Sequence, residues 1–208
     1  MAYTSSYPRQ FDAFSKFLNI EINGDPSVEE TALYSWFDNL FAGCYTIAEQ
    51  FCGQPLRQVN KTYQFYANAG RHGLENNHVW KYIPYYANTS LTALEWRENE
   101  FGTYTNYSAT DYAFQTEDFA CYIIFRNKSN GQFKATLQTG YTDNTMPFAI
   151  LQGITEMASL IYKQSADGGN WFGLSSVNSG GNGATVSQAL KENLDWQKHF
   201  RKYVMPAV

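Results

Sequence analysis

Charged side chains are scarce in this chain, and the few that occur are not clustered. Only 16% of the 208 residues are charged, the formal net charge is −4, and the 15 Lys and Arg residues are dispersed. Proteins that bind nucleic acids usually concentrate Lys and Arg on one face or stripe. The pattern therefore argues against a nucleic-acid-binding protein.

Cysteine and histidine are too few, and too scattered, to indicate a metal site. The cysteines are Cys44, Cys52 and Cys121, an odd number without metal-ligand spacing, and we expect buried thiols. The histidines are His72, His78 and His199. A surface loop explains His72 and His78 better than a metal or acid–base role does.

Motifs of known catalytic chemistry are missing as well. The glycine-rich stretches at 168–170 and 180–183 have no following Lys-Ser or Lys-Thr, so a phosphate-binding loop is not indicated. Glu95, Glu98 and Glu100 are candidates for the paired carboxylates of a glycosidase, although a solvated surface explains them more simply. We predict no catalytic residues, no cofactor and no metal.

Neither a long apolar run nor a leader sequence is present. No apolar stretch approaches the length of a membrane span, and residues 1–8 lack the basic region and apolar stretch of a signal peptide. We expect a product that stays in the cytoplasm where it is made and that has no membrane partner.

Aromatic residues, in contrast, are abundant. They make up 17% of the chain, with 16 Tyr, 15 Phe and 5 Trp. Tyr and Trp are common at protein interfaces, and aromatic faces also stack on sugars. An aromatic core explains the composition equally well, so composition alone leaves these alternatives open.

Residues 1–56 are predicted to be helical. A short amphipathic segment carries Phe11, Phe14, Phe17 and Leu18, and a long helix follows, with Asp25 as N-cap and Pro26 at its first position. Gly53 and Pro55 end this helix. Its main apolar stripe runs from Leu33 to Phe51. A second flank predicts a second packing partner, and we assign it to a subunit interface: Tyr34, Phe41 and Tyr45.

Residues 57–141 are predicted to be rich in strands. Leu91–Arg97 roughly alternates apolar and polar side chains, and Glu98–Gly102 forms a turn after it. Phe119–Phe125 is the strongest strand, and the step Asn130-Gly131 predicts a hairpin that returns along Gln132–Thr139. We expect one small antiparallel sheet.

Helix is predicted to return in the last third of the chain. Residues 146–164 form an apolar central helix, 165–183 a Gly/Ser-rich loop, and 184–208 a C-terminal helix and tail that begin with a capping box at Thr185. The predicted fold class is α+β. Its core is a helical bundle of the long N-terminal, central and C-terminal helices, with the sheet inserted.

The order of these segments resembles the head-tail connector (adaptor) family of tailed bacteriophages. The passages that carry the resemblance are Phe11–Ile20, Asp25-Pro26 with the helix that ends at Ala48–Leu56, the β section from Ile83-Pro84 to Phe133, and Leu137–Tyr141 followed by Pro147 and Ile161-Tyr162. The stretch Ala67–His78 departs from the family as an insertion, and the loop before the last helix is unusually long.

The resemblance implies a single adaptor domain over residues 1–208 and a structural virion protein that is not an enzyme. Such adaptors form closed rings of about twelve copies between the portal and the tail or stopper. The expected partners are therefore the portal, other neck proteins and further copies of the chain. DNA passes through the lumen only as cargo. The alternative is a phage-tail module that binds carbohydrate or a receptor through aromatic side chains, which predicts a mostly β chain.

The C-terminal segment is the predicted portal contact, because the family's C-terminal segments engage the portal. Aromatic residues beside Lys and Arg are typical of interface anchors. The predicted contact residues are Trp196, Phe200, Arg201, Tyr203, Met205 and Val208. The competing interpretation is a helix that closes the protomer's own core.

Overall fold

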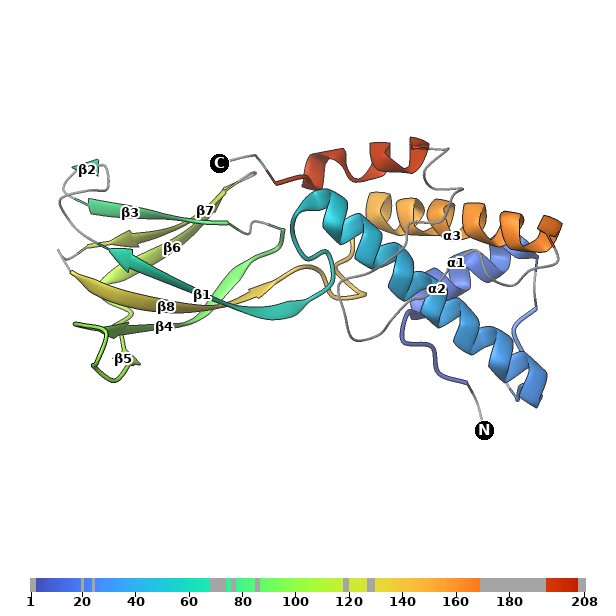
Figure 1. The fold of residues 1–208 in the computed structure, drawn as a ribbon, viewed down its shortest axis with the longest axis horizontal. Coiled ribbons are helices and arrows are strands. Elements are labelled where there is room, and N and C mark those ends of the chain that lie inside the picture. Colours follow the sequence, from blue (N-terminus) through green and yellow to red (C-terminus); the bar gives the residue numbers. More distant parts are fainter. Residues whose placement is uncertain are drawn as a thin grey trace. The chain divides into compact units, whose positions relative to one another are not determined.

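The computed structural model describes residues 3–19, 21–23, 25–67, 74–75, 78–84, 87–117, 120–126, 130–168 and 194–205. These residues belong to two compact units, residues 1–53 with 142–204 and residues 54–141 with 205–208. Helices make up the first unit and antiparallel strands the second (Figure 1). The α+β class is therefore confirmed, whereas a mostly β chain is not found.

The first two helices, α1 (Pro8–Leu18) and α2 (Val28–Cys52), begin and end at clear local signals. Ser27, rather than the predicted Asp25, caps α2. The Ser27 hydroxyl accepts from the Glu30 N–H at 3.2 Å, and the Ser27 N–H donates to the Glu30 carboxylate at 2.7 Å. This capping box satisfies two N–H donors, which a cap two residues earlier would not do. Gly53, with φ 70°, ends α2 as predicted.

Aromatic side chains join these helices to α3 (Phe148–Gly168). Phe14 of α1 is fully buried and makes edge-to-face contacts with Phe37 and Phe41 of α2 and with Tyr162 of α3. The ring centroids lie 5.2–5.9 Å apart, the range in which aromatic pairs attract. The core of the first unit is therefore built largely from rings.

The C-terminal segment is not the continuous α-helix that the sequence predicted. Over its described part it forms two short 3₁₀ helices, η1 (Asp195–His199) and η2 (Arg201–Tyr203). Backbone hydrogen bonds span three residues, for example from the Phe200 N–H to the Gln197 carbonyl at 3.0 Å. This tighter winding places Trp196, Phe200 and Tyr203 in the core of the first unit, and their burial outweighs helix propensity. Residues 184–193 of the predicted helix lie outside the described residues.

Within the part of the chain that the structure describes, the strands form two four-stranded antiparallel sheets, not the single small sheet that was predicted. One has the order β1-β8-β4-β5: Val59–Ala67, Gly131–Thr139, Ser90–Arg97 and Thr105–Asn106. The other has the order β2-β3-β7-β6: Leu74–Glu75, His78–Ile83, Ala120–Phe125 and Tyr112–Glu117. Both sheets contribute side chains to one hydrophobic core.

The predicted hairpin across Asn130-Gly131 is wrong, because its two strands belong to different sheets. β7 pairs with β3 and β6, and β8 pairs with β1 and β4. Phe125 of β7 and Phe133 of β8 pack across the shared core, with ring centroids 4.7 Å apart. Gly131 has φ 148°, and a Cβ there would lie 2.6 Å from the Arg97 carbonyl oxygen. Glycine therefore permits close approach to β4 at the start of β8, where the sequence predicted a turn.

Candidate functional site

A groove of about 660 Å³ lies between α1 and α3 in the first unit. Apolar side chains form much of its lining, and two of them stay accessible at its rim. Phe17 of α1 is 52% exposed and Phe148 of α3 is 75% exposed. Phe17 belongs to the predicted amphipathic segment, and Phe148 lies near the start of the predicted apolar central helix. Their exposure leaves an aromatic rim on which another chain could pack.

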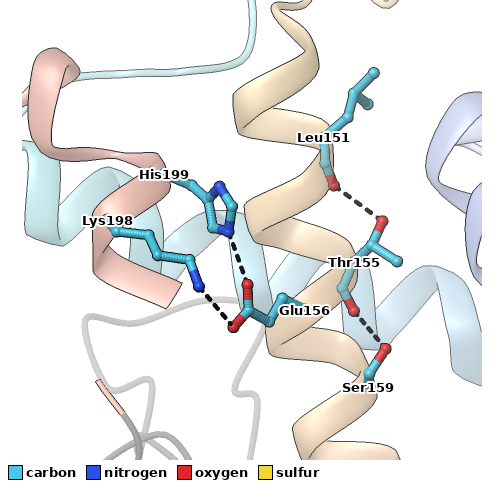
Figure 2. A network of polar contacts seen from close by, with 6 residues as sticks. All are labelled: Leu151, Thr155, Glu156, Ser159, Lys198 and His199. Carbon is cyan, nitrogen blue, oxygen red and sulfur yellow. Dashed lines mark hydrogen bonds and ion pairs between the residues drawn. The ribbon is translucent and has the colours of Figure 1, made fainter. Parts of the chain in front are cut away.

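The acidic groups of the groove have cationic partners. Asp12 pairs with Lys16 at 2.8 Å on the exposed side of α1. Glu156 of α3 pairs with His199 at 2.7 Å and with Lys198 at 3.7 Å, which ties η1 to α3 (Figure 2). Arg9 donates instead to the backbone carbonyls of Asp143 and Met146. The groove is therefore apolar, with its carboxylates compensated and a guanidinium at the start of α1.

The hydroxyl groups of α3 serve the helix and do not form a catalytic arrangement. Thr155 donates to the Leu151 carbonyl at 2.9 Å, and Ser159 donates to the Thr155 carbonyl at 2.7 Å (Figure 2). His199 pairs with Glu156, and the Ser159 hydroxyl is directed to the backbone. A nucleophile needs a base within hydrogen-bond reach. This network positions α3 and η1 and has no nucleophile–base pair.

The other titratable candidates from the sequence also have structural roles. Burial raises the pKa of the Cys121 thiol to about 11 and, together with the nearby Glu49 carboxylate, that of Cys52 to about 12. Burial also raises the pKa of Cys44. Glu95 forms an ion pair with Lys134 at 2.6 Å across β4 and β8. With these raised pKa values, the three cysteine thiols stay protonated at neutral pH and are poor nucleophiles.

Within the described residues no group of three or more His, Cys, Asp or Glu is placed to hold a metal ion. The described helices also include none that is long and apolar enough to cross a membrane. His72 lies outside the described residues, and of His78 only the backbone, in β3, is described.

The flank of α2 that was assigned to a subunit interface is covered within the protomer. Tyr34, Phe41 and Tyr45 are all buried, each at 1% exposure or less. Tyr34 packs on Phe11, and Tyr45 stacks on Tyr7 and accepts a hydrogen bond from Gln10. The second packing partner that the pattern predicted is therefore α1, together with the residue that precedes it. A subunit contact through these three side chains would need α1 to leave this position.

The predicted portal contact is divided by the structure into buried and accessible residues. Trp196, Phe200 and Tyr203 are at most 5% exposed, as the core-closing interpretation requires, whereas Arg201 is exposed. Trp196 packs edge-to-face on Phe51 of α2. Met205 is half-buried against the core of the second unit, and Val208 lies outside the described residues.

Neither a known family model nor a curated protein sequence matches this chain. Solved structures do. One is a chain from the neck of an empty gene transfer agent particle, computed with C6 symmetry. It has a TM-score of 0.59 and 14% identity, and the match covers 100% of this chain and 96% of that one. A second is a chain from the virion of a native gene transfer agent particle, with a TM-score of 0.56, 13% identity, and coverage of 99% and 94%.

The likeness is one of fold. It extends over nearly the full length of both chains, so the helical unit and the strand unit are matched together. At 13–14% identity the side chains of the groove are not carried over, and their role must be argued from this chain alone.

Sequence reasoning missed the groove and its rim. The periodicity of apolar residues predicts the apolar face of α1 and of α3, but the packing of the two helices decides which residues on that face are covered. Phe17 and Phe148 carry the same signal in the sequence as the buried Phe14 and Ile150. The exposed turn with Phe101, which is 97% accessible, was predicted only as a turn.

Proposed function

We propose that this chain is a structural protein in the neck of a phage-like particle, an adaptor whose copies form a ring between the portal and the tail or stopper. The observation that carries the proposal is the fold similarity, over the full length, to a chain from the neck of a gene transfer agent particle. The segment order of the sequence resembles the phage adaptor family and supports the same role. The virion neck, assembled in the host cytoplasm, is the proposed location.

The chemistry of the described residues is consistent with a structural role. The thiols are buried, the hydroxyls of α3 bond to its own backbone, and the carboxylates of the groove are paired. A conduit also has little use for clustered positive charge, because DNA must slide past its wall. A net charge of −4 with dispersed Lys and Arg fits a wall better than a DNA-binding surface.

We further propose that the portal is contacted by the accessible part of the C-terminal segment. Arg201 and Lys202 are exposed on η2, next to Tyr203, which is held in the core. The buried aromatic residues would then fix the position of the two cations instead of inserting into the portal. Met205 and Val208 would extend the contact beyond η2.

The test is assembly on the portal. The purified protein, mixed with the portal of the same particle, should give a multi-copy ring complex by mass photometry and electron microscopy. A monomer that never associates with portal or neck proteins would contradict the proposal. The double variant Arg201→Glu with Lys202→Glu should fold normally and lose portal binding, whereas Lys61→Glu, on an exposed position of β1, should retain it.

A further inference from the structure

The turn between β4 and β5 presents an aromatic side chain to solvent. Phe101 is 97% exposed, the highest value of any large apolar side chain among the described residues. Single exposed apolar residues are common and need no explanation by themselves. The construction of this turn distinguishes Phe101 from the others.

Several hydrogen bonds hold the turn in one conformation. The Asn99 side chain accepts from the Phe101 N–H at 3.0 Å, and the Gly102 N–H donates to the Asn99 carbonyl at 3.1 Å. The Arg97 guanidinium donates to the carbonyls of Glu100 and Gly102 at 2.8 and 3.4 Å. A turn that is held before binding loses less conformational entropy when its side chain is captured. Phe101 is thus preorganised as an anchor.

The guanidinium that organises the turn is itself held by the sheet. Arg97 Nε donates to the Gln132 side chain of β8 at 2.7 Å, and the guanidinium lies 4.5 Å from the ring centroid of Tyr104. The bracing therefore extends from the turn into the sheet. Glu98 and Glu100 are exposed on either side of Asn99, so the anchor carries carboxylates beside it.

The groove between α1 and α3 is large enough to receive an aromatic side chain, and its charges suit an acidic turn. At about 660 Å³ it lies within the range of roughly 300–1,000 Å³ typical of sites that enclose a ligand, and Phe17 and Phe148 form an aromatic rim. Its carboxylates are paired with Lys16 and with His199 and Lys198, whereas Arg9 contacts carbonyl oxygens. An incoming acidic turn would meet a positive charge at Arg9 and no uncompensated carboxylate.

We propose that Phe101 of one copy inserts into the α1–α3 groove of the neighbouring copy, with Glu98 and Glu100 beside Arg9. The inference rests on the proposed ring, because a closed ring requires each subunit to offer two different, complementary surfaces. The turn is one of these surfaces and the groove is the other. The contact is head-to-tail and leaves no copy in a closed ring with an unfilled groove.

The first experiment removes each aromatic anchor separately. Phe101→Ser and Phe148→Ser should each weaken ring formation about tenfold or more, measured by mass photometry over a range of protein concentrations, alone and with portal. Tyr66→Ser is the matched control, because Tyr66 is 55% exposed on β1, outside both surfaces. Circular dichroism and thermal unfolding should match wild type in all three variants.

The second experiment reverses the charges. Glu100→Arg should weaken assembly, and Arg9→Glu should do the same. In an equimolar mixture the reversed turn of one variant meets the reversed groove of the other, and the unchanged turn meets the unchanged groove. Alternating hetero-oligomers should therefore form, while neither variant self-associates. If the mixture behaves like the separate variants, the proposed pairing of Glu100 with Arg9 is contradicted.

Cross-linking between copies separates the remaining outcomes. Glu98→Cys protein and Gln152→Cys protein, mixed and treated with a short thiol cross-linker, should give a covalent heterodimer, because the native cysteines are all buried. Gln115→Cys, exposed on β6, replaces Glu98→Cys as the control and should give none. A chain with both Glu98→Cys and Gln152→Cys that is cross-linked only within itself would overturn the proposal.

The failure of this contact and the failure of the ring give different results. If wild-type protein forms rings and the Phe101→Ser and Phe148→Ser variants form them equally well, the contact is overturned and the adaptor proposal stands. If the Phe148→Ser variant still forms rings but no longer binds the portal, the portal occupies the groove, and the proposed contact between copies is overturned. Wild-type protein that forms no multimer, with or without portal, would remove both proposals.

Discussion

At the scale of single residues, Gly153 in the middle of α3 shows how closely the C-terminal segment packs. Glycine in a helix interior costs about 1 kcal/mol relative to alanine. A Cβ at this position would lie 2.6 Å from the Phe200 ring and 2.9 Å from the His199 Cβ. The position therefore has no space for a side chain while η1 and η2 remain where they are.

Gly153→Ala should lower the free energy of unfolding by about 1–3 kcal/mol, despite the better helix propensity of alanine, because it overpacks this contact. Urea denaturation measures the change. Phe200→Leu reshapes the contact, so its combination with Gly153→Ala should be less destabilising than the sum of the two single changes. Full additivity, or a Gly153→Ala protein as stable as wild type, would show that the C-terminal segment does not pack on α3.

The buried thiols should make the protein sensitive to alkali. Burial raises the pKa of Cys121 to about 11 and that of Cys52, near Glu49, to about 12, above the ordinary value of 9.0. Above this ordinary value the unfolded chain loses thiol protons that the folded chain retains. The stabilisation is complete below pH 9 and is lost as the pH rises toward 11–12, by at most about 1.4 kcal/mol per pH unit for each thiol.

Urea denaturation between pH 8 and pH 11 measures this slope. Tyr82, whose pKa burial also raises, adds to the loss, while Lys81, whose pKa burial lowers, opposes it. A variant with Cys44, Cys52 and Cys121 changed to Ala should show a shallower decline, and this comparison isolates the thiols. Equal slopes in the two proteins would contradict the assignment.

At the scale of elements, the start of α2 separates what local sequence determines from what it leaves open. The sequence contains Asp25-Pro26 and, two residues later, Ser27-Val-Glu-Glu30, and either is an acceptable helix start. The structure uses the second, in which Ser27 and Glu30 bond reciprocally. The prediction located the helix correctly and missed its cap by two residues.

Ser27→Ala should therefore cost about 1 kcal/mol of stability, because it leaves an N–H of the first turn without its acceptor. Asp25→Ala, made as the matched control, should cost clearly less, since Asp25 lies before the cap. Thermal unfolding of the two variants under the same conditions decides between them. The reverse order would restore Asp25 as the cap.

Strand pairing was the part of the fold that the sequence could not supply. The strands Leu91–Arg97 and Gln132–Thr139 were located nearly correctly, since alternation along a strand is a local property. Their partners depend on residues far away in the chain. β8 pairs with β1, which begins 72 positions earlier, and an Asn-Gly step that commonly makes a hairpin here begins a strand of the other sheet.

The candidate interface was predictable in part for the same reason. Trp196, Phe200 and Tyr203 were predicted to contact the portal, but periodicity does not say whether the residues that cover an aromatic side chain come from the same chain or from a partner. The structure supplies them from the same chain. Exposure of Phe17 and Phe148 follows from tertiary packing, and nothing in their sequence neighbourhoods distinguishes them from core residues, whereas Phe101 lies in a segment that the sequence predicts as a turn.

At the scale of the whole molecule, the strand unit has more of a core than the sequence suggested. The sequence predicts one domain in which the sheet is an elaboration on a helical core, with Leu33–Phe51 and Phe148–Ile161 exchanging hydrogen most slowly. Residues 54–141 contain a core of their own, in which Ile123, Phe133, Ala135 and Leu137 are fully buried. A segment with such a core can protect its amides independently of the helices.

We predict that the two units respond separately to core truncation. Phe133→Ala and Ile154→Ala each empty a fully buried site, one in each unit, and each should cost about 2–5 kcal/mol. In native-state hydrogen exchange followed by mass spectrometry, Phe133→Ala should accelerate the slow amides of β1, β4 and β8 and leave those of α2 and α3 nearly unchanged. Ile154→Ala should do the opposite, so each variant is the control for the other. If either variant accelerates the slow amides of both units equally, the chain unfolds as one cooperative domain, as the sequence predicts.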